Sequence, residues 1–507
     1  MQESIKSNEL PLVDSIVKST GKDALRYVPA KVVPGVISFL ALLIYTRIFT
    51  TEDYGNFYLA MAAVSVMSIL GSRWLVESVT RFYAQFELRK DLGRYFSTIL
   101  YSLVLSTLII LVLVVGGIFI LRGKISGEFA PFLGVGILVY ITSSIYNILL
   151  YTLRASLQAK SYSFYEILLS AGKLGMALLI VYLFKTGAIS LLVSIILIQV
   201  PLAFLMFRKF SILKRFSLKL VSREHIKEFF RFGSPLIISS LSVWLLVLSD
   251  RYMLNFYRSS AEVGIYSVSY SLVDRSVALL YTILMLAAHP IIIFTWEEKG
   301  KEITQKLIKD LSRYFFMICL PAFLGISVLS REIFSVLVGK DFVESFRLVP
   351  FFAFCSFCGG LFQYIGKGFE IRKKTLLLAL IIFLSGGLNV VLNLLLIPQY
   401  GTVGAGIAKS ISYAGLIILG IKMSHSLMPW QVSGRSVSRI ALAGVIMTSC
   451  LILAKNLLSI SLFNLILLIA LGVVVYTGIL LLIKEITHGE IQLIKSYSAR
   501  FIKPMIH

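Results

Sequence analysis

The segment RKFSILKRFSLKLVSREHIKEFFR, residues 208–231, lies between long apolar stretches and decides how we divide the chain. Its basic residues greatly outnumber its acids, and Ile, Leu and Phe recur between them. This pattern predicts a basic helix on an anionic membrane surface. A solvated linker is compatible with the same pattern, and we do not expect nucleic-acid binding in so apolar a chain. The segment is predicted to join two halves of six helices each.

Composition places the chain among α-helical membrane proteins. Mean hydropathy is +0.87, only 15% of the residues are charged, and apolar runs of about twenty residues, each enough to cross a bilayer, recur along the chain. Spanning strands are not expected, because the runs lack the alternation of a barrel wall and open sheet edges are not tolerated in lipid. The sequence therefore predicts an all-α polytopic membrane protein of about 14 spans.

The spans divide the chain into six predicted parts. These are an N-terminal tail (1–24), a six-helix lobe (25–207), the linker (208–231), a second six-helix lobe (232–424), two extra helices (437–484) and a C-terminal tail (485–507). Lys and Arg are concentrated in the tails and in the even-numbered connections, so both termini are expected to be cytoplasmic. We expect no signal peptide, since the first residues of the sequence are polar. We expect a multi-pass protein of the cell membrane.

An internal repeat supports the two halves. Residues of the fifth span and the loop after it recur at a constant offset in the second half: Lys160, Gly172, Leu174, Leu178 and Gly187 correspond to Lys374, Gly386, Leu388, Leu392 and Gly401. A weaker echo relates Arg47 and Gly55 to Arg251 and Gly264. Because six spans return the chain to the side on which it entered, the halves should be related by a pseudo-twofold axis along the membrane normal, with a cavity between them.

Charged residues inside the spans are the candidate functional residues. A charge at the centre of a spanning helix costs about 2.5–3.5 kcal/mol, so such groups should face one another or a water-filled cavity. The predicted substrate-binding residues are cationic, and the acids are predicted to form ion pairs or to couple transport to an ion. The cations are Lys31, Arg73, Lys173, Arg275 and Lys367, and the acids are Glu77, Asp250 and Asp274.

Several of these charges have a structural alternative. Three of the basic residues are close enough to the cytoplasmic face for their side chains to extend to it: Lys31, Lys367 and Arg81, which follows Glu77 on the same helix face. Arg73 and Glu77, four residues apart, can form an ion pair within one helix. Asp250, next to Arg251, is expected near an outer helix end, where a structural role is also open.

The excess of cations indicates an anionic substrate. Guanidinium and ammonium groups bind pyrophosphate through charge-assisted hydrogen bonds. Proline supplies the predicted bends, because it removes a backbone hydrogen bond inside a helix. Pro29 and Pro34 in the first helix of one half, and Pro235 in the first helix of the other, are predicted to act at paired gates.

Two stretches near the N-terminus resemble a known family. LLIYTRIFTTEDYGNFY (42–58) and SILGSRWLVESVTRFY (68–83) are similar to the polysaccharide-export or O-antigen flippases of the multidrug/oligosaccharidyl-lipid/polysaccharide exporter superfamily. Thr50–Thr51 stands where that family usually has Gly-Pro. The resemblance implies a flippase whose two lobes alternate between inward-open and outward-open states. It would move a polyprenyl-(pyro)phosphate-linked oligosaccharide to the outer leaflet for surface glycan assembly.

The resemblance also implies partners, and two other functions stay open. Expected partners are the lipid-linked oligosaccharide, anionic membrane lipids and the polymerase or glycosyltransferases of the same pathway. An ion-coupled multidrug antiporter would need more buried acids than cations, the reverse of this chain. A membrane glycosyltransferase or polymerase would use an acidic pair such as Glu52–Asp53. The loop that holds this pair is short, however, and two acids at this place are more typical of a helix N-terminus. We expect no enzyme, no cofactor and no metal, because the histidines form no ligand pattern and Cys319, Cys355, Cys358 and Cys450 lie in apolar segments.

Overall fold

Apolar spans fold into helices throughout the part of the 507-residue chain that the computed structural model describes, residues 29–121, 123, 126–486 and 490. The predicted N-terminal tail lies outside these residues, as does most of the C-terminal one. No strand occurs in the described ranges. The first half contains α2 (Pro29–Ile48), α3 (Thr51–Gly71), α4 (Arg73–Leu88), α5 (Leu92–Leu121), α6 (Phe129–Ala155), α7 (Ala159–Phe184) and α8 (Ile189–Lys209).

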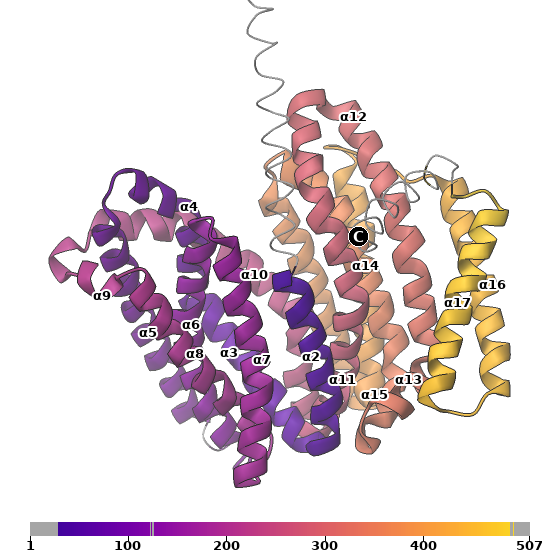
Figure 1. Cartoon of the computed structure of the whole chain (residues 1–507), viewed down its shortest axis with the longest axis horizontal. Coiled ribbons are helices and arrows are strands. Elements are labelled where there is room, and N and C mark those ends of the chain that lie inside the picture. The colour runs from indigo at the N-terminus through magenta and orange to yellow at the C-terminus, as the bar shows by residue number, and fades with distance from the viewer. Residues whose placement is uncertain (1–28, 122, 124–125, 487–489, 491–507) are drawn as a thin grey trace, which may run out of the picture.

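The second half repeats this plan with longer helices. It contains α10 (Arg223–Tyr257), α11 (Ser260–Val273), a π-helical turn η2 (Asp274–Ala278), α12 (Leu279–Val328), α13 (Ser330–Leu337), a 3₁₀ segment η3 (Lys340–Leu348), α14 (Val349–Ile371) and α15 (Thr375–Ser424). The last two helices, α16 (Gly434–Leu457) and α17 (Leu462–Leu482), pack on each other, and α16 also packs on α12. In Figure 1 the first half forms one body, the second half another, and α16 and α17 lie at the far edge.

Twelve helical segments of the described chain are long and apolar enough to cross a membrane. Two of them are bent at glycines with positive φ, Gly300 (φ 73°) and Gly401 (φ 55°), where other residues would be strained. Each of these two therefore counts as two spans, which makes fourteen. The predicted all-α membrane fold is thus confirmed.

The second span is not one continuous helix. Its first segment, α3, ends at Gly71, and its second segment, α4, begins at Arg73. A Cβ on Gly71 would lie 2.0 Å from the Tyr140 hydroxyl, and the Ser106 hydroxyl donates to the Gly71 carbonyl at 2.6 Å. The close approach of α5 and α6 at this point accompanies the change of helix direction.

The linker differs from the predicted single basic helix. It consists of the end of α8, a four-residue α9 (Ile212–Arg215), a 3₁₀ turn η1 (Leu218–Leu220) and the first residues of α10. Two hydroxyls on α5 hold it in this form: Ser97 accepts from the backbone N–H of Ser217 at 3.0 Å, and Thr98 from that of Ser222 at 3.3 Å. These bonds compete with a continuous helix and attach the linker to the first lobe.

The apolar core joins the lobes mainly at one end, although the start of α10, through Phe229, also packs on α4 of the first lobe at the linker end. One buried cluster draws on both halves and includes Tyr54 of α3, Val139 of α6, Tyr266 of α11 and Phe352 of α14. The other large clusters lie mainly within one lobe each. The shared cluster lies toward the short α2–α3 and α10–α11 loops, opposite the linker, and the two bodies diverge toward the end that carries α9 (Figure 1).

Candidate functional site

Two cavities lie where helices of the first lobe meet helices of the second. One, of about 410 Å³, is lined by α2 on one side and by η2 and α12 on the other. The second, of about 460 Å³, is lined by α3 and α4 on one side and by α10 on the other. The two cavities occupy equivalent places in the repeat. Helices α2 and α10 are the first spans of the two halves, and α4 and η2 each follow the first segment of the second span of their half.

The first cavity contains the π-helical turn. Asp274 and Arg275 occupy its first two positions and line the cavity opposite Pro34 and Ser38 of α2. A guanidinium N–H of Arg275 donates to the Ser38 carbonyl at 2.6 Å, which joins the two lobes. A π-turn widens the helix locally, and such turns are frequent at functional sites. Arg275 thus presents its remaining donors beside a cavity between the lobes.

Lys173 lies near Arg275 without lining either cavity. It projects from α7, which packs on α2, and its side chain is half-buried. The charges that act on its ammonium are those of Glu166 and Arg275. The structure therefore brings together two of the predicted cations, Lys173 and Arg275, from opposite lobes.

The second cavity contains the predicted intrahelical pair. A guanidinium nitrogen of Arg73 lies 2.7 Å from a carboxylate oxygen of Glu77, and both residues line the cavity opposite Ser240 of α10. The Nε atom of Arg73 is buried and has no hydrogen-bond partner among the residues that the structure describes. Part of the guanidinium is thus free of the ion pair. The structure places Arg73 and Arg275 in separate cavities rather than in one cluster.

The remaining predicted cations lie apart from these cavities. Lys367 is only 4% exposed, and its ammonium lies 2.6 Å from a Glu370 carboxylate oxygen and 2.9 Å from Nδ1 of His289. Lys31 is exposed in the first described turns of α2, near Pro29, and Arg81 is exposed on α4. Pro34 and Pro235 both fall inside helices, α2 and α10 respectively, as predicted.

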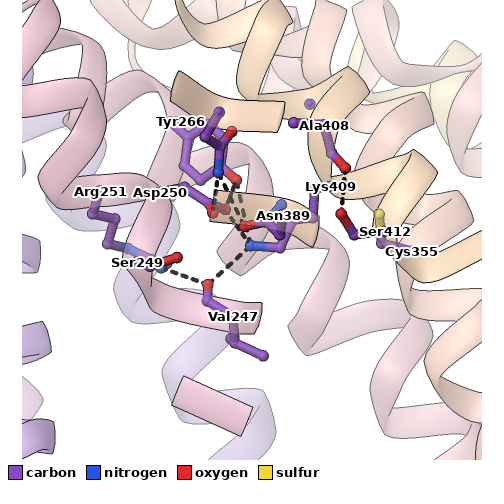
Figure 2. Close-up of polar contacts among 12 residues, drawn as sticks. Val247, Ser249, Asp250, Arg251, Tyr266, Cys355, Asn389, Ala408, Lys409 and Ser412 are labelled. Atoms are coloured by element: carbon purple, nitrogen blue, oxygen red, sulfur yellow. Dashed lines mark hydrogen bonds and ion pairs between the residues drawn. The ribbon is translucent and has the colours of Figure 1, made fainter. Parts of the chain in front are cut away.

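A buried polar network in the second lobe surrounds Asp250 (Figure 2). Asp250 and Lys409 are both 0% exposed, and the ammonium lies 2.5 Å from Oδ2 of the carboxylate. The Tyr266 hydroxyl donates to the same oxygen, and the Asn393 amide donates to Oδ1 at 2.9 Å. Lys409 also donates to the Val247 carbonyl at 2.9 Å. The network connects α10, α11 and α15.

Sequence reasoning missed this network. Asp250 was expected near a helix end, whereas it is fully buried and belongs to the interior of α10. Lys409 was not among the predicted site residues. The available signal was an acid, Asp250, and a base, Lys409, in separate spans of the same half, together with Asn389 and Asn393 four residues apart.

Two glycines bring the lobes into close contact at the opposite end from the linker. A Cβ on Gly55 would lie 1.8 Å from the Ser260 carbonyl oxygen, and one on Gly264 would lie 2.0 Å from the Thr51 carbonyl oxygen. Gly55 is on α3 and Gly264 on α11, so the contact is reciprocal. We call these two residues and their contacts the glycine seam. The echo seen in the sequence between these glycines thus becomes a symmetric contact between lobes.

Aromatic side chains extend the contact from the seam toward the cavities. The hydroxyls of Tyr58 and Ser271 lie 2.8 Å apart, and the Tyr252 hydroxyl donates to the Leu59 carbonyl at 3.1 Å. The Trp244 indole N–H donates to the Ala62 carbonyl at 3.3 Å. All three bonds cross from one lobe to the other. Their rupture would be required for the lobes to separate at this end.

Comparisons with known proteins agree with this architecture. A family model described as "Polysaccharide biosynthesis protein" matches residues 21–296. The chain is 24% identical over 463 residues to a probable low-salt glycan biosynthesis flippase, Agl15, of Haloferax volcanii, a match that covers 89% of this chain and 93% of that one.

Solved structures share the fold. The lipid II flippase MurJ in an inward closed conformation has a TM-score of 0.71 at 14% identity, covering 89% of this chain and 96% of that one. An inward-facing multidrug resistance transporter of the MATE family, in the MOP superfamily, has a TM-score of 0.56 at 15% identity, covering 78% and 95% of the two chains. At these identities the likeness concerns the fold.

Proposed function

Because this chain belongs to the polysaccharide biosynthesis protein family, we propose that it is a flippase for a polyprenyl-(pyro)phosphate-linked oligosaccharide. Membership confirms the resemblance drawn from residues 42–58 and 68–83. The substrate would move from the cytoplasmic to the outer leaflet of the cell membrane, for assembly of surface polysaccharide or another glycan. The glycan-flippase description of the Haloferax relative supports this function.

The observation that carries the proposal is the approach of Arg275 to the first lobe. Its guanidinium binds a carbonyl of α2 across the cavity, and the ammonium of Lys173 acts from α7 on the same region. An anionic headgroup entering between the lobes would meet the guanidinium of Arg275 in the cavity, with the charge of the Lys173 ammonium behind it on α7. Charge-assisted hydrogen bonds of this kind contribute about 1.5–3 kcal/mol each. In this proposal Lys173 and Arg275 bind the pyrophosphate, and Arg73 and Lys31 extend the path. Lys367 is the least suited of the predicted binding residues, because its ammonium is engaged by Glu370 and His289.

Transport would proceed by alternating access. The lobes are joined at the glycine seam and diverge toward the linker, an arrangement that suits an inward-facing state if the linker is cytoplasmic. Opening toward the outer leaflet would separate Gly55 from Gly264 and bring the two lobes together at the end that carries the linker. Helices α2 and α10 would bend at Pro34 and Pro235. The polyprenyl chain would stay in lipid. We further propose that both termini are cytoplasmic and that polymerase or glycosyltransferases of the pathway act on the same substrate.

An antiporter for cationic drugs is less compatible with the charges. Such a transporter needs free carboxylates, but Glu77 is paired with Arg73, and Asp250 with Lys409. Of the three candidate acids, Asp274 is the one that forms no ion pair within the described structure.

The proposal is tested by a leaflet-access assay. Purified protein is reconstituted in liposomes that contain a fluorescent polyprenyl-pyrophosphate oligosaccharide, and a membrane-impermeant quencher reports the fraction in each leaflet. Protein-dependent redistribution is expected. If the probe is not redistributed, while a cationic dye accumulates under an ion gradient, the function is that of an antiporter instead.

A further inference from the structure

Among the three candidate acids, Asp274 differs from Glu77 and Asp250 in that its side chain has no partner within the described part of the chain. Glu77 lies 2.7 Å from Arg73 and Asp250 lies 2.5 Å from Lys409. Within the described residues, no hydrogen bond or ion pair reaches the Asp274 carboxylate, although it occupies the middle of a membrane span. A lone carboxylate at such a depth is costly and marks a functional site.

The carboxylate is also positioned beside the proposed headgroup site. Asp274 is exposed, lines the cavity of about 410 Å³ and immediately precedes Arg275. Arg275 is directed toward α2, where it binds the Ser38 carbonyl, so it does not neutralise Asp274 by direct contact. An anion bound to Arg275 would therefore lie close to a second negative charge.

Other titratable groups around Asp274 do not remove this conflict. Arg275 on its own turn and Arg251 on α10 are the cations that act on it, and both have other partners. Tyr270 on α11 and Tyr281 on α12 face it as neutral phenols. From the neighbouring helices, Tyr45 of α2 interacts with Arg275, and Cys355 of α14 with Tyr270.

We propose that Asp274 takes up a proton when an anionic headgroup binds between the lobes, so that substrate binding and protonation are linked. This inference rests on the proposed function. In the empty site the ionised Asp274 balances part of the charge of Arg275 and Arg251. When a pyrophosphate binds, it takes over that role, and its negative charge beside the ionised carboxylate disfavours both groups. Protonation of Asp274 relieves the repulsion and leaves the cations to the substrate.

Linkage fixes the sign of the effect. A ligand that favours the protonated form binds more tightly at lower pH, and one linked proton changes the affinity by at most about tenfold per pH unit. Removing the titratable carboxyl should abolish this contribution without removing the cationic donors. Asp274→Asn is nearly isosteric, and Asp274→Glu keeps the titratable group.

The experiment is calorimetric titration of the purified full-length protein with farnesyl pyrophosphate in two buffers of different ionisation enthalpy. The difference in heat gives the number of protons taken up per ligand bound. Proton release by the ligand itself is the same for every variant and cancels in the comparison. Wild type and Asp274→Glu are expected to take up more protons than Asp274→Asn, by a number approaching one. Glu344→Gln, at an exposed ion pair with Arg347, is the matched control and should behave as wild type.

The outcomes are distinguishable. Equal proton uptake by wild type and Asp274→Asn would overturn the linkage while leaving the flippase intact. Binding that depends on sodium in wild type but not in Asp274→Asn would assign a metal cation to this carboxylate and overturn the proton assignment. Failure of wild type to bind the probe at any pH would overturn the proposed function, and this linkage with it.

Discussion

The ammonium of Lys409 lies 2.5 Å from the carboxylate of Asp250, and neither side chain is exposed. The two residues are 159 positions apart and belong to α15 and α10. Two charges removed from solvent are tolerated only when they are paired and hydrogen-bonded, a condition that Tyr266 and Asn393 complete. The pair therefore holds the first helix of the second lobe against its last pair of spans.

Loss of one partner should destabilise the second lobe strongly. Lys409→Met leaves an unpaired buried carboxylate, which costs about 3–5 kcal/mol. A lower unfolding temperature of the purified protein in detergent is the expected result. The double variant Lys409→Met/Asp250→Asn should recover much of the loss, because it removes both charges.

The control for this experiment lies one turn away. Ser412 is fully buried on the same helix, and its hydroxyl donates only to the Ala408 carbonyl of that helix, so Ser412→Ala should change the unfolding temperature little. If Lys409→Met were as stable as Ser412→Ala, the pair would not be a structural connection.

Side chains at the glycine seam should force the lobes apart. Gly55→Val and Gly264→Val would each place a Cβ within about 2 Å of a backbone oxygen of the other lobe, too close for any rearrangement of a side chain to relieve. We expect these variants to shift the protein toward an outward-open state. The measurement is labelling of a cysteine introduced at Thr282, a cavity residue, by an impermeant maleimide from each side of the membrane, with the four native cysteines replaced.

Gly134 provides the matched control, because a Cβ there meets nothing within 4 Å. Gly134→Val should label as the parent does. Unchanged labelling from the outer side in both seam variants would show that the seam does not close the outer end.

The cation of Arg73 should matter more than its ion pair. Its Nε is buried without a partner, and the second cavity places it opposite α10. Arg73→Gln is expected to lower transport about tenfold or more, as loss of one charge-assisted contact implies, whereas Glu77→Gln should lower it less. Transport rates in liposomes, normalised to the amount of folded protein, give the comparison. A larger loss in Glu77→Gln would indicate that the carboxylate, and not the cation, is the functional group.

Most of the fold follows from the sequence, since apolar length and the distribution of Lys and Arg depend only on local composition. The internal repeat is also visible in the sequence, and the two glycines of its weaker echo, Gly55 and Gly264, lie at the contact between the lobes. The breaks could not be predicted in the same way. The end of α3 at Gly71 coincides with contacts from Tyr140 and Ser106 of other helices, and the π-turn at Asp274 leaves no hydropathy signal.

The grouping of the candidate site residues could not be predicted from the sequence. Buried cations indicated an anionic substrate, yet only tertiary structure separates Arg73 from Arg275 and joins Asp250 to Lys409. Each of these groupings depends on helix rotation, which one sequence does not reveal.

The most direct test of the account compares three proteins in the leaflet-access assay: wild type, the double variant Lys173→Gln/Arg275→Gln, and Arg347→Gln as a matched control. Arg347 is an exposed cation that pairs with Glu344 outside both cavities. The account predicts rapid redistribution of the polyprenyl-pyrophosphate oligosaccharide by wild type and Arg347→Gln, and a loss of about a hundredfold in the double variant. Equal rates for all three proteins would contradict a cationic headgroup site between the lobes.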